Sequence, residues 1–180
     1  MKTYIALFRG INVGGNNILP MKELRTLLKN LGFRQVNTYI QTGNVVFQSD
    51  NSDIGQLADS ISGEVNKQFG FEPRVFVMTQ DELQAAARAN PFHGAESEPS
   101  RLYLTFLAEA PQNPDLEALE DIKRDSERFE LKGKVLYLHA PEGVGRSKLA
   151  AKVERHLDVP MTSRNWRTVQ KIMEMAEEAI

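Results

Sequence analysis

Three short segments of the sequence are rich in cationic or amide side chains, and the first two also contain glycine. Residues 9–17 read RGINVGGNN, residues 143–148 read GVGRSK, and residues 163–168 read SRNWRT. Arg, Lys and Asn side chains donate hydrogen bonds, and glycine lets a ligand approach bare backbone N–H groups. Such donors suit the holding of an anion better than the breaking of a bond. A fourth segment, QTGN at residues 41–44, is a tight turn of similar polarity.

These segments supply the ligand contacts that we predict. In the amino-terminal half they are Arg9, Asn12, Gly14, Gly15, Gln41, Thr42 and Asn44. In the carboxyl-terminal half they are Ser147, Lys148, Arg164, Asn165, Trp166 and Thr168.

Most of these residues also have a purely structural interpretation. The glycines can shape tight turns, and a Gly-Asn pair can join two strands without a ligand. Ser147 and Asn165 can cap helices, Lys148 can be solvated, and Trp166 can be a packing anchor. Arg164 is the hardest to explain this way, because a bidentate donor beside a helix start suits a carboxylate or phosphate.

Several kinds of active site are missing from the sequence pattern. The glycine segments match neither GxGxxG nor the P-loop. There is no cysteine and no GxSxG, and His93, His139 and His156 stand apart without metal-ligand spacing. No carboxylate pair stands near the polar segments to serve as a general base. We therefore predict no metal and no cofactor, and leave open whether the protein is an enzyme and which residues would be catalytic.

Composition indicates a cytoplasmic protein that does not enter a membrane. The 180 residues are 41% hydrophobic and 26% charged, with no apolar run of about 18 residues. The amino terminus has no signal-peptide pattern. Nucleic acid is an unlikely partner, because the RNP1 pattern is absent and the isoelectric point is near 6.0.

The charge is unevenly distributed along the chain. Residues 1–50 carry six Lys and Arg against two Asp and Glu, and residues 146–171 carry seven against two. Residues 51–145 carry nine against seventeen. Because the basic stretches contain the polar segments, we expect both stretches to face one ligand.

Hydrophobic spacing predicts two copies of one motif. In the first copy, strands at 3–9, 36–40, 45–47 and 73–78 alternate with two helices. Pro20 is predicted at the N1 position of the first helix, Gly32 ends it, and Asp53 caps the second. This β-α-β-β-α-β order is the ferredoxin-like unit. A short extra helix follows, with Thr79 and Glu82 as a capping box.

The second copy repeats the order of the first. Strands are predicted at 102–107, 129–131, 135–138 and 159–162, with helices marked by Leu116 and Leu149 and a closing helix near the carboxyl terminus. The fold class is thus α+β, a duplicated ferredoxin-like arrangement with extra helices between the units and at the carboxyl end. We predict domains at 1–90 and 101–180, joined by a linker at 91–100 that is rich in Pro, Ser and Glu.

The predicted topology groups the polar segments into two corners. In a ferredoxin-like unit, the loop after the first strand and the turn between the second and third strands share one end of the sheet. The first corner therefore combines residues 9–17 with 41–44. By the same reasoning, the second corner combines residues 143–148 with 163–168.

The motifs in these corners resemble a bacterial family known as domain of unknown function 1697. The resemblance depends on YIALFRGINVGG at the start, QTGNVVF, GRSKL, and SRNWRTV near the end. It implies a duplicated ferredoxin-like fold and brings no established activity. We expect a protein that binds a small anionic ligand, phosphate-like or nucleotide-like. A protein-interaction or regulatory module is the alternative; an enzyme of unknown reaction or a nucleic-acid binder ranks lower.

Overall fold

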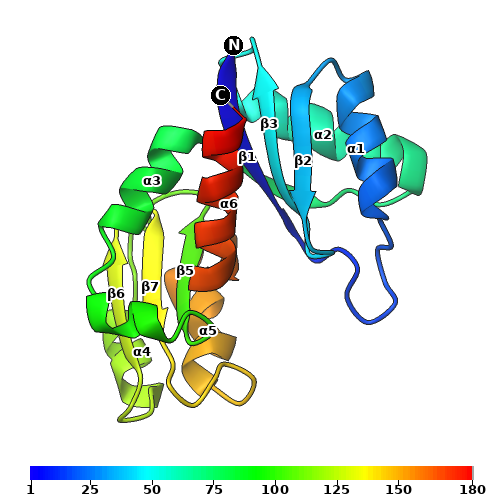
Figure 1. Ribbon diagram of the computed structural model, residues 1–180. Coiled ribbons are helices and arrows are strands. Elements are labelled where there is room, and N and C mark those ends of the chain that lie inside the picture. Colours follow the sequence, from blue (N-terminus) through cyan, green and yellow to red (C-terminus); the bar gives the residue numbers. More distant parts are fainter. Residues whose placement is uncertain (180) are drawn as a thin grey trace. The chain divides into compact units, whose positions relative to one another are not determined.

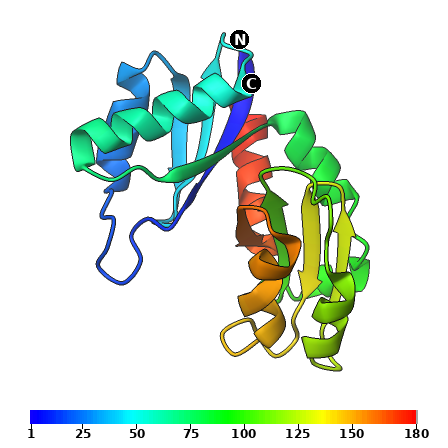
Figure 2. The ribbon, with the colours of Figure 1, turned by 180° about the vertical axis from the view of Figure 1, so that it is seen from behind.

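The computed structural model describes residues 1–179 of the chain (Figures 1 and 2). The chain divides into two compact units, Met1–Ala85 together with the residues from Gln170 onward, and Ala86–Val169. Within the described residues, no helix has both the length and the apolar character needed to cross a bilayer.

The first unit is built on a four-stranded antiparallel sheet with strand order β2-β3-β1-β4. Its elements are β1 (Lys2–Arg9), α1 (Met21–Asn30), β2 (Arg34–Tyr39), β3 (Asn44–Ser49), α2 (Ile54–Phe69), β4 (Arg74–Thr79) and the start of α3 (Gln80–Arg88). β1 lies between β3 and β4, which is why its six central residues are all buried. This order is that of the ferredoxin-like unit.

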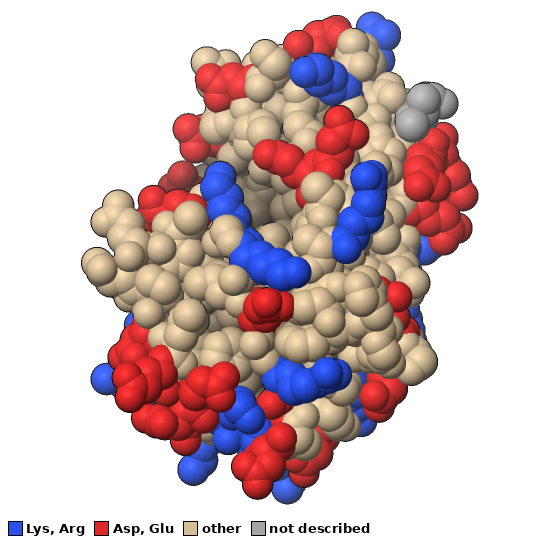
Figure 3. Space-filling view, turned by 90° about the vertical axis from the view of Figure 1, so that its left-hand side faces the viewer, with Lys and Arg blue, Asp and Glu red and all other residues tan. Residues whose placement is uncertain are grey.

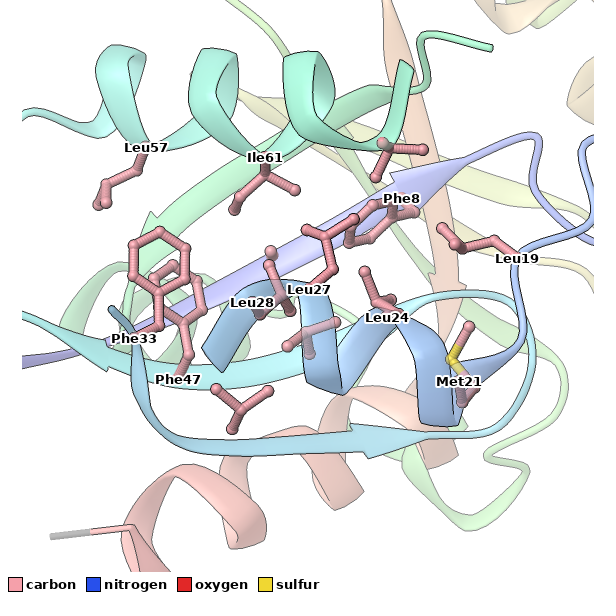
Figure 4. Close-up of a cluster of buried hydrophobic side chains, with 14 of the residues drawn as sticks. Phe8, Leu19, Met21, Leu24, Leu27, Leu28, Phe33, Phe47, Leu57 and Ile61 are labelled. Carbon is pink, nitrogen blue, oxygen red and sulfur yellow. The ribbon is translucent and has the colours of Figure 1, made fainter. Parts of the chain in front are cut away.

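Helices α1 and α2 cover one face of the first sheet and enclose its core (Figures 2 and 4). Leu24, Leu27 and Leu28 recur at helical spacing on the buried side of α1. They meet Phe8 and Phe47 from the sheet (Figure 4). Burying such side chains contributes about 1.5–3 kcal/mol each, so this core holds the loops at the ends of the strands.

The second unit repeats this arrangement with strand order β6-β7-β5-β8. Its elements are a 3-10 helix (His93–Ser97), β5 (Leu102–Leu107), α4 (Leu116–Ile122), β6 (Arg128–Lys132), β7 (Val135–His139), α5 (Lys148–Leu157), β8 (Met161–Asn165) and the start of α6 (Trp166–Glu178). Helices α4 and α5 pack on one face of its sheet. The predicted duplication of the ferredoxin-like unit is therefore confirmed.

The predicted helix caps are confirmed, with one exception. The Asp53 side chain accepts from Gln56 N at 3.0 Å, and Glu82 accepts from Thr79 N at 2.8 Å while Thr79 Oγ1 accepts from Glu82 N. The prediction for Pro20 is wrong by one residue. Its ψ of 136° is extended, so Pro20 is the N-cap, and its carbonyl accepts the first helical bond from Leu24 N.

The last predicted strand is also misplaced. It runs over Met161–Asn165, not 159–162, because Thr105 and Leu104 of β5 pair with Ser163 and Arg164. The polar segment at 163–168 is therefore half strand and half helix, not a loop. The predicted 91–100 linker contains the 3-10 helix, in which Ala95 is buried. The domain limits themselves stay a prediction.

Candidate functional site

The two loops of the first corner lie against each other, as the topology predicts. The Asn12 side chain donates to the Gln41 carbonyl at 2.7 Å and to the Leu19 carbonyl at 2.9 Å, and accepts from Leu19 N at 2.7 Å. Phe8 N donates to the Gly43 carbonyl at 2.9 Å. The Asn12 carboxamide thus joins the start and end of one loop to the neighbouring turn.

Gly14 and Gly15 form the tip of a miniature hairpin. Val13 and Asn16 pair across it, and Asn16 N donates to the Val13 carbonyl at 3.0 Å. Both glycines have positive φ, 58° and 76°, as a type I′ turn requires. Asn12 N is also used inside the loop, by the Asn17 carbonyl. The N–H groups of Asn12 and Asn16 thus form hydrogen bonds within the loop. Contact of Gly14 and Gly15 with a ligand stays a prediction.

The QTGN turn is also fastened within the first unit. Asn44 is buried and donates to the Tyr39 carbonyl and to Thr42 Oγ1, both at 3.0 Å. A Cβ on Gly43 would lie 2.6 Å from Phe8 Cβ, so only glycine fits there. Arg9 is exposed at the end of β1, opposite Arg74 in register. Ligand contacts of Arg9, Gln41, Thr42 and Asn44 stay predictions.

The first corner also exposes aliphatic side chains. Val13, Ile18 and Ile40 are 61%, 55% and 48% exposed. Val13 follows Asn12 in the sequence, and the other two precede Leu19 and Gln41, whose carbonyls accept hydrogen bonds from the Asn12 side chain. Ile40 has a φ of 50°, which is unusual for a β-branched residue. The outer surface of this corner is therefore partly apolar.

The second corner contains a pocket of about 630 Å³, which we call the arginine pocket. It is lined by Arg101, Tyr103, Arg124, Glu142, Gly143, Val144, Gly145 and Arg146. The lining comes from the start of β5, the loop between α4 and β6, and the loop between β7 and α5. These three segments meet at one end of the second sheet.

Hydrogen bonds hold these segments together. Ala140 N donates to the Arg101 carbonyl at 2.9 Å, and Gly143 N donates to the Ala140 carbonyl at 2.8 Å. The Arg124 guanidinium donates to the Arg146 carbonyl, also at 2.9 Å. The pocket therefore has fixed backbone walls.

Within residues 1–179, the guanidinium groups of Arg101 and Arg146 have no acidic partner. Neither forms an ion pair with a carboxylate among residues 1–179, and both are exposed. The one acid in the lining, Glu142, accepts from Ser126 Oγ at 2.6 Å. Three guanidinium groups in one pocket repel one another, and a bound anion would relieve that repulsion.

Gly143 explains how Arg101 reaches the pocket. Its φ is 84°, and a Cβ there would lie 2.3 Å from Arg101 Nη1. The positive φ favours glycine at this position, and the Arg101 guanidinium occupies the space that a side chain would otherwise take.

Ser147 and Lys148 do not line the arginine pocket. Ser147 is buried; its Oγ accepts from Ala150 N at 3.0 Å and donates to the carboxylate of Glu127, which is also buried. The Glu127 carboxylate also accepts from Arg124 N at 2.8 Å. Ser147 and Glu127 thus support the pocket from behind, while Lys148 is exposed at the first turn of α5.

The residues predicted at 164–168 are mostly buried. Arg164 donates to Thr162 Oγ1 at 2.7 Å and to the Ser163 carbonyl at 2.9 Å, and burial lowers its pKa to about 10. Asn165 caps α6 by accepting from Thr168 N at 3.0 Å. Trp166 is buried, and its Nε1 has no hydrogen-bond partner within the described part of the chain. None of these residues lines the arginine pocket, and their contact with a ligand stays a prediction.

Metal binding has no obvious place in the described part of the chain. Residues 1–179 bring together no group of three or more His, Cys, Asp or Glu that could hold a metal ion.

Figure 3 shows acidic and basic side chains interspersed on the face in view, without a broad basic area.

Comparison with known proteins identifies the family. The family model described as Protein of unknown function (DUF1697) matches residues 1–137. The chain belongs to this family. No curated protein matches the DUF1697 chain. A solved structure, the conserved bacterial protein SP0830 from Streptococcus pneumoniae, is similar to it at 28% identity and a TM-score of 0.70. The alignment covers 97% of this chain and 98% of that one.

Sequence reasoning missed most of the arginine pocket in this DUF1697 protein. Arg101, Tyr103 and Arg124 carry no motif and stand far from the glycine segment in sequence. The predicted topology contained the necessary signal. In the second unit, the start of β5 and the loop before β6 lie at one end of the sheet. The loop that enters α5 lies at the same end. Applying that rule to every Arg would have found Arg101 and Arg124.

The expectation that both corners face one ligand concerns the placement of the two units, and it stays a prediction.

Proposed function

We propose that this DUF1697 protein binds a small anionic ligand, phosphate-like or nucleotide-like, in the arginine pocket of its second unit. One observation carries the proposal: Arg101 and Arg146 line a pocket of about 630 Å³ without a carboxylate partner in residues 1–179. Arginine is the side chain best suited to hold phosphate or carboxylate oxygens in two parallel hydrogen bonds. A cytoplasmic location belongs to the same proposal.

The roles of the lining residues follow from their positions. Arg101 and Arg146 contact the anion from two sides, since they come from different segments of the chain. Arg124, whose guanidinium already donates to the Arg146 carbonyl, contributes positive charge and holds that loop in place. Gly145 leaves its backbone open to the ligand, whereas the space beside Gly143 is taken by the Arg101 guanidinium.

The proposal is tested by titration calorimetry of the full chain with inorganic phosphate and pyrophosphate. Arg146→Ala and Arg101→Ala each remove one charge-assisted contact, so we expect each to weaken binding by about 1.5–3 kcal/mol, roughly 10- to 150-fold. Lys148→Ala is the matched control, because Lys148 is a nearby exposed cation outside the lining. Equal losses in all three variants would indicate general screening, and no binding to the wild type would refute the proposal.

A protein-interaction module is the second candidate. The observation that favours it is the exposed aliphatic surface of the first corner, formed by Val13, Ile18 and Ile40. Exposed apolar clusters often mark protein contacts. A thermal-shift screen with small anions separates the candidates, since a module without a small ligand would give no shift with any of them.

A further inference from the structure

The lining of the arginine pocket is not only charged, because it also includes one aromatic and one aliphatic side chain. Tyr103 and Val144 both line the pocket, and both also pack against the hydrophobic core beneath α4 and α5. Tyr103 lies on β5 between Leu138 of β7 and Asn165 of β8, so its backbone is held from both sides. An inorganic ion would leave this fixed apolar surface uncovered, whereas a ligand with a ring would cover it.

The charge of the pocket sets the charge of its occupant. Arg101, Arg124 and Arg146 supply three positive charges, and Glu142 supplies one negative charge. The lining therefore has a net charge of two positive units. A phosphate monoester carries about 1.5 to 2 negative charges at pH 7 and so balances it, whereas a single carboxylate does not.

We propose that the ligand is a phosphate monoester carrying an aromatic ring, such as a nucleoside monophosphate. The phosphate lies between Arg101 and Arg146, and the ring stacks on Tyr103. Stacking on an aromatic side chain tolerates any flat ring, so the proposal concerns the class of ligand and not one base. This inference rests on the proposed function, because it needs the phosphate to bind in the arginine pocket.

The experiment compares four compounds by titration calorimetry with the full chain: adenosine 5′-monophosphate, ribose 5-phosphate, inorganic phosphate and adenosine. We expect the nucleotide to bind about tenfold more tightly than ribose 5-phosphate, because only the nucleotide can stack. Adenosine, which lacks the phosphate, should bind weakly. The comparison uses the wild-type protein and needs no variant.

Two substitutions then assign the preference to Tyr103. Tyr103→Leu should remove the tenfold preference for the nucleotide and leave the affinity for ribose 5-phosphate unchanged. Tyr103→Phe keeps the ring and should keep the preference. Thermal melting of each variant checks that the second unit is folded, which matters because Tyr103 is half-buried against the core.

The outcomes separate this inference from the proposed function. If ribose 5-phosphate and the nucleotide bind equally well, the aromatic part is refuted and the anion site stands. If the preference persists in Tyr103→Leu, the ring binds elsewhere and the inference is also refuted. If no phosphate compound binds, the proposed function fails and takes this inference with it.

Discussion

Ser147 is one residue with two structural tasks. Its hydroxyl oxygen accepts from Ala150 N and caps α5, and its hydroxyl proton goes to the buried carboxylate of Glu127. Sequence reasoning assigned Ser147 either to a cap or to a ligand. The structure places it under the arginine pocket with 3% of its surface exposed, which leaves it no access to solvent. A residue of this kind affects binding through the loops it supports.

We predict that Ser147→Ala destabilises the protein by about 2.5–4 kcal/mol. Loss of an N-cap costs about 1 kcal/mol, and loss of a donor to a buried carboxylate costs about 1.5–3 kcal/mol. Urea unfolding measures the change. Ser126→Ala is the matched control, because Ser126 bonds to the exposed Glu142 and should change stability by less than about 0.5 kcal/mol. Similar values for both variants would show that the Glu127 contact contributes little.

At the scale of an element, the hairpin of β2 and β3 has an unfavourable backbone conformation in its turn. Its turn begins at Ile40, whose φ of 50° brings a branched Cβ close to the backbone. The turn is nevertheless fixed from outside, since Asn12 binds the Gln41 carbonyl and Phe8 N binds the Gly43 carbonyl. Neighbouring contacts therefore hold a conformation that this residue does not favour.

We predict that Ile40→Asn stabilises the protein by about 1 kcal/mol, because asparagine tolerates positive φ. Chemical denaturation measures the gain. Val13→Asn is the control: Val13 is also an exposed aliphatic of the first corner, but its φ is not positive. An equal gain in both variants would mean that lost apolar exposure is responsible, and a loss in Ile40→Asn would mean that the Ile40 side chain packs usefully.

At the scale of the whole molecule, ligand binding and stability are linked. A ligand that binds only the native state, present at 100 times its Kd, adds about 2.7 kcal/mol to the free energy of unfolding. If the whole chain unfolds in one transition, that corresponds to a rise in Tm of about 5–10 °C. The arginine pocket lies in the second unit, so a ligand bound there would stabilise that unit directly.

We therefore predict that pyrophosphate raises the Tm of the full chain and that the rise is largely lost in Arg146→Ala. Differential scanning calorimetry measures both, with sodium chloride at matched ionic strength as the control for screening. A rise of the same size in the variant would show that pyrophosphate acts elsewhere on the molecule or through the solvent.

Local patterns in the sequence predicted most of the elements, with errors at the last strand and in the 91–100 segment. Leu24, Leu27 and Leu28 recur at helical spacing, and Asp53 and Gly32 mark helix ends by their own chemistry. The order of elements then gave the ferredoxin-like duplication and placed Asn12 beside Gln41. These features could be predicted because they depend on residues close together in the chain or on a topology with few alternatives.

The burial of polar groups and the identity of the pocket lining were decided only by the tertiary structure. The type and position of Arg164 suggested an anion clamp, and only pairing with β5 showed that it is a strand residue, 9% exposed, whose ligand contact stays a prediction. Arg101, Tyr103 and Arg124 carry no local signal, because a pocket gathers residues distant in sequence whose side chains meet only once the sheet has formed. Whether a donor faces a ligand or a neighbouring carbonyl depends on those long-range contacts, which residue type and spacing do not specify.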